Sequence, residues 1–439
     1  MNSYRTSTWG DEISLEYGKS LKGYQNSNGK YQVFGSNGPI GWTDKPLCKG
    51  PGIILGRKGA YRGVKFSEKD FYVIDTAYYV VPKTDIDLNW LYYAIKYHKL
   101  GEIDDGSPIP STTRAAVYVR EFDIPSKEVQ VKMGNILKKI DLKIELNNQI
   151  NETLESIAQA IFKSWFIDFE PVRVKIAAKQ EGNDPELAAM CVISGKSEEE
   201  LQQMAKDDFA ELQATAALFP DEFVDSELVE MPKGWEVGCV EDIATAKGGY
   251  AFKGSQFVEK GYPVIKIKNI TGDGEVDIQG TQCIEEKTAR TAAKFMLHDC
   301  DLVMAMTGAT VGKIGLVNTH GKSIYLNQRV AKFESEKFGG KISYFLFCLF
   351  NRKEYFEQIV GTAQGSAQPN ISSSGIESTS IIVPNFELIN LFIKNTDSIF
   401  QYWLKNGSTN NFLNQIRDTL LPKLLSGDVE LTDFITEDE

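Results

Sequence analysis

The strongest constraint on the fold of this 439-residue chain is a long internal repeat. Three pairs of segments match: Gly106–Pro110 with Gly365–Pro369 at an offset of 259 residues, Ile54–Gly63 with Val303–Gly312 at 249, and Trp9 with Trp235 at 226. Solenoid repeats have periods of roughly 20–50 residues, so a period this long indicates a duplication. The sequence therefore predicts two similar modules in tandem.

Each copy is predicted to be a mixed globular block of the α/β or α+β class. Short β-branched and aromatic runs bounded by Gly, Pro or Asp are typical of buried strands. These runs are residues 52–55, 72–74, 77–81, 117–119, 263–268 and 301–305. Residues 88–99 and 342–356 have the length and apolar periodicity of helices. Each block therefore combines sheet and helix.

A long helix is predicted after each block. Ser126 is a suitable N-cap, and about 40 residues without proline follow it. Apolar residues at heptad spacing predict a seam, and we expect the two helices to form an antiparallel coiled coil about a pseudo-two-fold axis. The predicted seam positions are Met133, Ile136, Ile140, Asn147, Ile150, Leu154, Ile157 and Ile161 in the first helix, and Phe392, Ile399, Tyr402, Asn406, Leu413, Ile416 and Leu420 in the second.

Both predicted seams carry an asparagine at the equivalent place, Asn147 and Asn406. In an antiparallel pair the two amides can face each other, and a buried asparagine in a seam fixes register at a cost in stability. The alternative is that both asparagines are exposed to solvent. The sequence leaves these two arrangements open.

The order of these features divides the chain into five segments. They are a first globular block at 1–125, a long helix at 126–170, a linker at 171–232, a second block at 233–384, and a second long helix with a tail at 385–439. We call residues 1–125 module one and residues 233–384 module two. The modules lie in tandem, and the long helices separate them.

The net charge of −12 is concentrated in two of these segments. Residues 177–232 carry a net charge of −11 and residues 385–439 carry −5, so both modules are close to neutral. A local basic face that binds DNA is therefore possible on either module. Residues 197–218 predict an acidic helix, which is either a solvated helix or a docking surface for a protein partner.

The motifs of catalysis are missing from the sequence. Gly308-Ala-Thr-Val-Gly-Lys313 has three residues rather than four before its Gly-Lys, and Ile314 replaces the Ser or Thr of a phosphate-binding loop. There is no serine-hydrolase G-x-S-x-G, no H-E-x-x-H and no Pro-Pro dipeptide of the kind that adenine methyltransferases need. We expect a chain that is not an enzyme and holds no metal or cofactor.

The cysteines and the hydropathy indicate the compartment. The six cysteines are scattered and form no C-x-x-C pair, which favours reduced thiols. The chain lacks an apolar run long enough to cross a membrane, and its first residues do not resemble a signal peptide. We therefore expect a cytoplasmic protein without a membrane partner.

Polar, glycine-rich loops are the candidates for a binding face. Arg, Lys, Asn, Gln and Thr side chains suit base edges and phosphates. The candidates in module one are Arg57, Lys58, Arg62, Thr112, Thr113 and Arg114. Those in module two are Lys247, Tyr250, Lys253, Lys266, Lys268, Asn269, Thr307, Thr310, Lys313, Gln364, Gln368 and Asn370.

The chain resembles the specificity subunit of type I restriction-modification systems over almost its full length. Five short segments carry the resemblance, namely Met231–Trp235, Gly308–Gly315, Gln368–Ile371 before Val383-Pro384, Leu421–Gly427 and Phe162–Pro171. Each segment alone is degenerate. Their order, together with the duplication, makes the match specific.

The resemblance implies a function and a set of partners. Each block would be a target recognition domain that reads one half of a bipartite site in double-stranded DNA. The two helices would set the half-site spacing and recruit two methyltransferase subunits, and through these two restriction and translocase subunits. S-adenosylmethionine, ATP and magnesium would belong to those partners, and this chain would be non-catalytic.

Three other interpretations stay open at this point. The chain could be a cytosolic coiled-coil scaffold that binds only proteins, or an enzyme with unrecognised chemistry. It could also be the specificity subunit of another restriction-modification class. A salt-sensitive interaction with duplex DNA that carries a split site separates a DNA reader from a scaffold.

Overall fold

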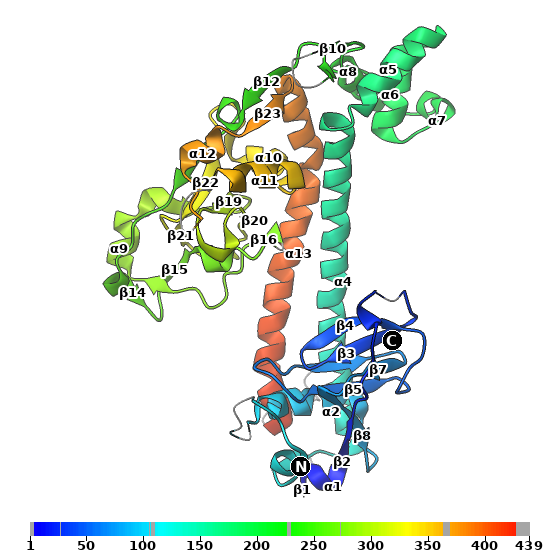
Figure 1. Ribbon diagram of the computed structural model, residues 1–439, viewed down its shortest axis with the longest axis vertical. Helices are drawn as coiled ribbons and strands as arrows, with labels where there is room; N and C mark the ends of the chain where they lie inside the picture. Colours follow the sequence, from blue (N-terminus) through cyan, green and yellow to red (C-terminus); the bar gives the residue numbers. More distant parts are fainter. Residues whose placement is uncertain are drawn as a thin grey trace. The chain divides into compact units, whose positions relative to one another are not determined.

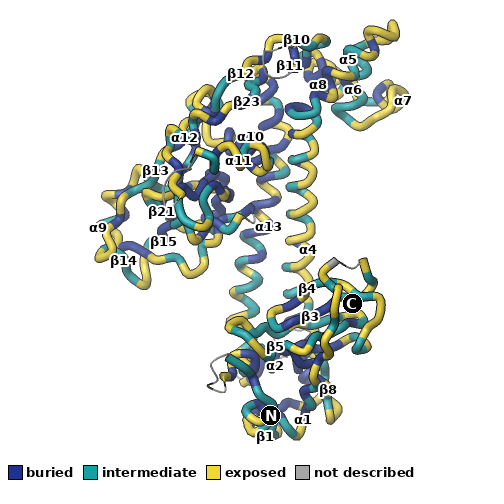
Figure 2. The backbone as a smooth tube through the Cα atoms, in the orientation of Figure 1, coloured by how far each residue is buried: buried dark blue, intermediate teal, exposed yellow. Residues whose placement is uncertain are grey.

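The computed structural model describes residues 4–26, 28–104, 106, 110–225, 230–272, 274–362 and 369–426 (Figure 1). The chain forms two compact units, one of residues 1–146 with 410–439 and the other of residues 147–409. Module one belongs to the first unit, and the linker and module two belong to the second. Buried residues gather in the interior of each module (Figure 2).

Module one contains a four-stranded sheet in the order β2-β8-β5-β6 and a three-stranded sheet in the order β4-β3-β7. A separate ribbon joins β1 and β9 at the two ends of the module. The strands are β1 (Arg5–Thr8), β2 (Ile13–Tyr17), β3 (Tyr31–Gly35), β4 (Gly38–Thr43), β5 (Gly52–Gly56), β6 (Val64–Ser67), β7 (Phe71–Val73), β8 (Ala77–Pro82) and β9 (Glu121–Ile124), and the helices are α1 (Trp9–Glu12), α2 (Leu88–Tyr97) and α3 (Arg114–Tyr118). Apolar residues of α2 and of the four-stranded sheet share one buried core.

Module two repeats this arrangement with additional strands. Its larger sheets have the orders β13-β22-β19-β20-β16 and β14-β17-β15-β21-β18, and its ribbon joins β12 and β23. The strands are β12 (Glu236–Cys239), β13 (Thr245–Gly248), β14 (Phe257–Val258), β15 (Tyr262–Ile265), β16 (Gly274–Glu275), β17 (Cys283–Ile284), β18 (Met296–Leu297), β19 (Leu302–Ala305), β20 (Ile314–Leu316), β21 (Ile324–Leu326), β22 (Val330–Glu334) and β23 (Ser380–Val383). The helices are α9 (Glu286–Thr291), α10 (Ile342–Phe350), α11 (Lys353–Gly361) and α12 (Ser373–Glu377). The fully buried α10 occupies the position that α2 has in module one.

Strand register confirms the duplication and corrects one of its anchors. In the ribbons, Arg5 pairs with Ile124 and Glu236 pairs with Val383. Directly after the first strand of each ribbon, the Trp9 amide donates to Arg120 O at 3.0 Å, and the Val240 amide donates to Thr379 O at 3.1 Å.

Trp9 is therefore equivalent to Val240, and the predicted match of Trp9 with Trp235 is wrong. Trp235 precedes its ribbon strand β12, whereas Trp9 follows its ribbon strand β1. The two tryptophans resemble each other in sequence but occupy different places in the fold. The repeat segment around Gly106 and its counterpart at 365–369 fall largely outside the described residues.

Two local predictions also need correction. Residues 117–119, predicted as a strand, belong to or follow helix α3, because the Thr113 side chain accepts a hydrogen bond from Ala116 N and caps the helix. Ser372 caps the equivalent helix α12 in the same way. The single helix predicted at 342–356 is broken at Asn351 and Arg352 into α10 and α11.

The long helices α4 (Lys127–Phe166) and α13 (Phe386–Ser426) run antiparallel within each unit. In the second unit, the rings of Phe162 and Phe392 lie 5.7 Å apart, and Asn151 Nδ2 donates to Trp403 O at 3.1 Å. In the first unit, Arg417 Nη1 donates to Asp141 Oδ1 at 2.8 Å. Residue numbers rise along one helix as they fall along the other, as predicted.

The predicted seam is one residue out of phase at alternate positions of both helices. Ile157 is 44% exposed and Tyr402 is 49% exposed, whereas the next residues, Ala158 and Trp403, are buried. The offset is already present at the start of α4, where Leu137 is completely buried and the predicted Ile136 is half-buried, because the helix steps four residues from Met133 where the list steps three. Of the other seam positions, Met133, Asn147, Phe392 and Asn406 are buried, and Ile136, Ile140, Ile150, Leu154, Ile161, Ile399, Leu413, Ile416 and Leu420 are half-buried.

Both central asparagines are buried, so the exposed alternative is wrong. Asn406 Nδ2 donates to Asn151 Oδ1 at 2.9 Å, and Asn151 lies one helical turn beyond Asn147 on α4. An amide pair therefore lies between the helices, formed by the buried Asn406 and the half-buried Asn151.

The acidic linker is a small helical bundle rather than one helix. Its helices are α5 (Glu170–Glu181), α6 (Pro185–Ser194), α7 (Glu198–Gln202) and α8 (Lys206–Ala217), followed by the hairpin of β10 (Phe223–Asp225) and β11 (Glu230–Pro232). Ala189, Met190, Leu201 and Ala216 form its core. The helix predicted at 197–218 begins with Ser197, which caps α7, and breaks between α7 and α8.

Candidate nucleic-acid interface

Both modules build the same backbone turn beside the Gly-Ala motif. A single backbone bridge pairs Lys58 with Ser111 in module one and Thr307 with Asn370 in module two. Gly59 and Gly308 have φ angles of +105° and +84°, a region that favours glycine. These equivalent turns, which we call the Gly-Ala turns, present polar side chains from the same frame in each module.

In module one, two arginines stack on an exposed tyrosine beside this turn. The guanidinium carbons of Arg57 and Arg114 lie 4.8 and 4.2 Å from the centroid of the Tyr17 ring. Arg57 Nη1 donates to Asp75 O at 2.9 Å, and Arg114 Nε donates to Leu15 O at 2.6 Å. Stacked and anchored guanidinium groups lose little freedom on binding, and they suit the O6 and N7 acceptors of guanine.

Three other predicted readers of module one hold the loop together instead. The Arg62 guanidinium donates to Gly59 O and Gly101 O at 2.6 and 2.8 Å. Thr112 is buried, and its hydroxyl donates to the carbonyl oxygen of Ile103 at 3.0 Å. Thr113 caps α3, whereas Lys58 is exposed. Arg62, Thr112 and Thr113 therefore have structural roles.

In module two the cations beside the Gly-Ala turn are lysines. Lys266 Nζ lies 3.4 Å from the centroid of the Phe257 ring. The pKa of Lys266 is lowered, mainly by burial and to a smaller extent by the charge of Lys268. Lys268 Nζ donates to Gly280 O at 3.2 Å and Lys313 Nζ donates to Thr271 O at 2.6 Å. The segment Ile267–Asn269 touches the Gly-Ala turn, because Thr310 Oγ1 donates to Ile267 O at 3.0 Å. These three lysines, 266, 268 and 313, form the cationic part of the module-two face.

The remaining module-two candidates differ in their surroundings. Asn269 is buried with its amide bonded to Asp277 O, so it is structural, whereas Lys247 is exposed and forms an ion pair with Glu334 at 2.7 Å. Tyr250 packs against Phe252, and Thr307 Oγ1 donates to Pro369 O at 3.1 Å. Lys253 and Asn370 are exposed, and Gln364 and Gln368 lie outside the described residues.

Sequence reasoning missed the aromatic side of the module-one face. Tyr17 is 46% exposed and Tyr61, inside the Gly-Ala turn, is 79% exposed. Tyr61 stands between glycines and a basic residue, which is a signal that could have selected it. Tyr17 ends strand β2 and carries no local pattern, because its arginine partners come from distant parts of the chain.

The described part of the chain offers neither a metal site nor a membrane-spanning helix. Among the residues that the structure describes, no group of three or more His, Cys, Asp or Glu side chains could hold a metal ion. Within the same described ranges, every helix is too short or too polar to cross a membrane.

Comparison with known proteins gives a consistent family. The family model for the type I restriction modification DNA specificity domain matches residues 7–156 and 232–414. The chain is 32% identical over 385 residues to the Type I restriction enzyme HindI specificity subunit of Haemophilus influenzae, covering 83% of this chain and 82% of that protein. It is 26% identical over 361 residues to the Type I restriction enzyme MjaIX specificity subunit of Methanocaldococcus jannaschii, covering 81% and 72%.

A solved structure supports the fold. The crystal structure of the type I restriction-modification S subunit from M. genitalium aligns with a TM-score of 0.59, over 97% of this chain and 96% of that one. At 16% identity, this likeness concerns the fold alone.

Proposed function

The chain belongs to the family of type I restriction-modification DNA specificity subunits, and we propose that each module reads one half of a bipartite DNA site. The observation that carries this proposal is a shared frame with divergent side chains. The ribbons of the two modules pair in equivalent registers, while the faces beside the Gly-Ala turns carry arginine and tyrosine in module one and lysine and phenylalanine in module two. One frame with two sets of contacts suits two different half-sites.

The two faces offer the chemistry that DNA readout needs. Arg57 and Arg114 supply guanidinium edges for guanine, and Tyr17 and Tyr61 supply aromatic surface. Lys266, Lys268 and Lys313 supply point charges for phosphates or single base acceptors. Part of the affinity should therefore be electrostatic and should fall as salt rises.

The long helices are proposed to set the spacing and to recruit the catalytic partners. Leu142 and Leu146 on α4 are exposed apolar residues within the first unit, and so is Phe412 on α13. Apolar residues exposed on a helix are available for a partner surface. The expected partners are two methyltransferase subunits, which in turn bind two restriction and translocase subunits.

Catalysis and cofactors are assigned to those partners. In this proposal the chain selects the sequence and does no chemistry, and S-adenosylmethionine, ATP and magnesium bind to the methyltransferase and translocase subunits. Bacterial or archaeal DNA as the ligand makes the cytoplasm the expected compartment.

The test is binding of duplex DNA by the chain assembled with its methyltransferase subunits. The methylation motif of the source genome supplies the duplex, and two control duplexes have one half scrambled. We expect tight binding to the intact site only, with affinity falling about a thousandfold or more between 50 and 200 mM salt if six or more phosphates are contacted. Equal binding to all three duplexes would favour non-specific attachment, and no binding would favour the protein scaffold.

A further inference from the structure

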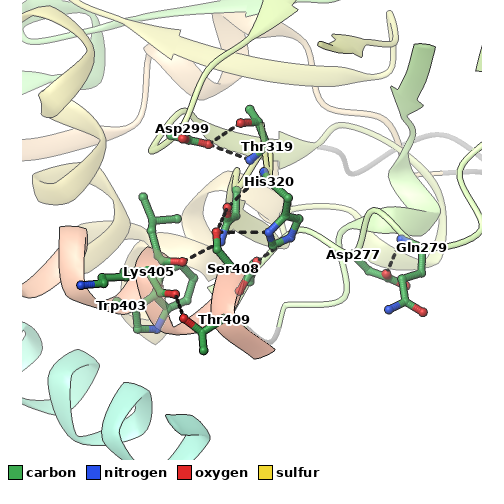
Figure 3. Close-up of polar contacts among 12 residues, drawn as sticks. Asp277, Gln279, Asp299, Thr319, His320, Trp403, Lys405, Ser408 and Thr409 are labelled. Atoms are coloured by element: carbon green, nitrogen blue, oxygen red, sulfur yellow. Dashed lines mark hydrogen bonds and ion pairs between the residues drawn. The ribbon is translucent and has the colours of Figure 1, made fainter. Parts of the chain in front are cut away.

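Module two is fastened to helix α13 by a cluster of polar residues near the middle of that helix. Within the second unit, Glu275 comes from β16, Asn318 and His320 come from the turn after β20, and Gly407 and Ser408 come from α13. We call these five residues the joint cluster. Figure 3 shows His320 directed toward Ser408.

Both ends of the Asn318 side-chain amide form hydrogen bonds with one turn of α13. Its Nδ2 donates to Leu404 O at 2.8 Å, and its Oδ1 accepts from Ser408 Oγ at 2.9 Å. Asn318 is almost completely buried. A shift of the module along α13 by one turn would leave these buried polar atoms without partners, which is expensive.

His320 ties the helix to Glu275. Its Nδ1 lies 3.3 Å from Ser408 Oγ, and its Nε2 lies 3.6 Å from Glu275 Oε1. The backbone of His320 has a φ angle of +48°, in the left-handed region that favours glycine. A histidine persists there only when its surroundings determine its position.

The same contact explains why residue 407 is a glycine. A Cβ at this position would lie 2.5 Å from Glu275 Oε2 and 3.0 Å from Asn318 Nδ2. Glycine inside a helix is otherwise unfavourable relative to alanine. The helix therefore accepts a glycine where the two side chains of module two reach its backbone.

We propose that Glu275, Asn318 and His320 are positioning residues that hold module two at one fixed point of α13, and thereby determine which half-site spacing the subunit accepts. The inference rests on the proposed function, in which this module reads one half-site. Directional hydrogen bonds fix a register, whereas apolar contacts alone tolerate sliding. The apolar residues Phe392, Phe400 and Trp403 of the same helix supply the remaining packing.

Burial of Glu275 supports the assignment. Burial raises the pKa of this carboxyl to about 7, and the hydrogen bond from Asn318 opposes that rise. Burial disfavours the charged form of this carboxyl at the contact between module two and α13. A role in fixing the position of the module explains why the carboxyl is placed there.

The test uses the variant Gly407→Ala in the complete complex with the methyltransferase subunits. Duplexes carry both native half-sites, separated by the native spacer or by one or two base pairs more or fewer. The wild-type complex should prefer the native spacer. Gly407→Ala should reduce that preference about tenfold, the effect of losing roughly one buried hydrogen bond, while the preferred bases in both halves stay the same.

Two further variants separate positioning from folding. Gly361→Ala at the end of α11 is the matched control, because a Cβ there meets nothing within 4 Å, and it should leave the spacing profile unchanged. Ser408→Ala removes one hydroxyl without adding volume, so it serves as the test if Gly407→Ala fails to fold. It should relax the spacing profile in the same direction.

A double variant tests the contact itself. Glu275→Ala removes the carboxylate that the added methyl group would meet, so Gly407→Ala combined with Glu275→Ala should unfold at a higher temperature than Gly407→Ala alone. The double variant should still show the relaxed spacing profile, because the tie from His320 to Glu275 is lost.

The outcomes separate the two claims. A Gly407→Ala or Ser408→Ala complex that folds and keeps the wild-type spacing profile would overturn the positioning role. A change in the bases read, with the profile intact, would overturn it as well. If the wild-type complex shows no preference among half-site sequences, the proposed function fails and this inference fails with it.

Discussion

Module one and module two have the same framework and different polar contents. Their main sheets share the order β2-β8-β5-β6 and β13-β22-β19-β20, and equivalent backbone amides, those of Trp9 and Val240, donate across equivalent ribbons. The faces beside the Gly-Ala turns differ in their cationic groups, guanidinium in module one and ammonium in module two, and in their aromatic residues. Strand pairing therefore preserves the frame of a duplicated module while the exposed side chains diverge.

One carboxyl in each module has a shifted pKa, and the two shifts go in opposite directions. Glu12 in module one accepts hydrogen bonds from Arg5, Ser7 and Thr84, and the bond from Arg5 contributes most to holding its pKa at about 2. Glu275 in module two lies beside His320 rather than an arginine, and burial raises its pKa to about 7. Module one therefore buries a charged carboxylate, and module two holds a half-buried carboxyl whose pKa is near neutrality.

The largest expected effect comes from exchanging equivalent core residues. Trp9 is completely buried, and its ring stacks on Phe122 at 3.8 Å. Trp9→Val places the module-two side chain in the module-one core and leaves a cavity, which should cost about 3–5 kcal/mol in the free energy of unfolding. Chemical denaturation measures this loss, with Val240→Ala as a control that removes less volume. A loss below about 1 kcal/mol would mean that the two cores are interchangeable.

The second effect concerns the charged carboxylate of module one. Glu12→Gln leaves the Arg5 guanidinium without its anion and should cost about 2–3 kcal/mol at pH 7. Because the folded pKa is below the unfolded value, the stabilisation is present above about pH 4.5 and is lost as the pH falls toward 2. Denaturation between pH 2 and 7 should therefore show a shallower acid limb for Glu12→Gln, and an unchanged limb would refute this role.

The third effect separates readers from structural arginines in module one. Arg57→Ala should cost about 1–3 kcal/mol of binding and relax one base position in one half-site. Arg62→Ala, the matched control, removes hydrogen bonds to Gly59 O and Gly101 O and should lower stability without changing base preference. Selection from a randomised duplex library measures both. Loss of binding by Arg57→Ala that is uniform across sequences would reassign it to a phosphate.

The smallest effect is the pH dependence of module two. The folded pKa of Glu275 is above its unfolded value, so its contribution is complete below about pH 4.5 and is lost as the pH rises through about 7. His320, Asp299 and Lys322 are titratable groups whose charges also act on this region. Glu275→Gln should flatten the stability profile between pH 5 and 8 by about 1 kcal/mol, and thermal unfolding across that range checks it. A profile as steep as that of the wild type would assign the dependence to His320 instead.

Features whose sequence pattern extends over many residues were predictable from the sequence. The duplication, both long helices and the helix α2 were correctly predicted, because each rests on many residues with one periodicity. The family resemblance rests on the order of several short motifs, and the comparisons confirm it.

Features that depend on tertiary contacts were not predictable from the sequence. The seam was one residue out of phase at Ile136, Ile157 and Tyr402, because steps of three and of four residues both fit an apolar pattern and only the packing of the helices decides between them. Thr112 and Asn269 look like surface residues in a polar loop, and only the fold buries them among carbonyl groups. The exposed Tyr17 was missed because Arg57 and Arg114 meet it from distant segments.

The exchange of one module tests the central claim most directly. Residues 233–384 are replaced by the corresponding module of another specificity subunit, the variant is expressed with its methyltransferase subunits, and the methylated motif is read by sequencing of the host DNA. The account predicts that one half of the bipartite motif changes while the other half is retained. A change in both halves, or a change in the spacing with both halves retained, would contradict independent readout by two modules.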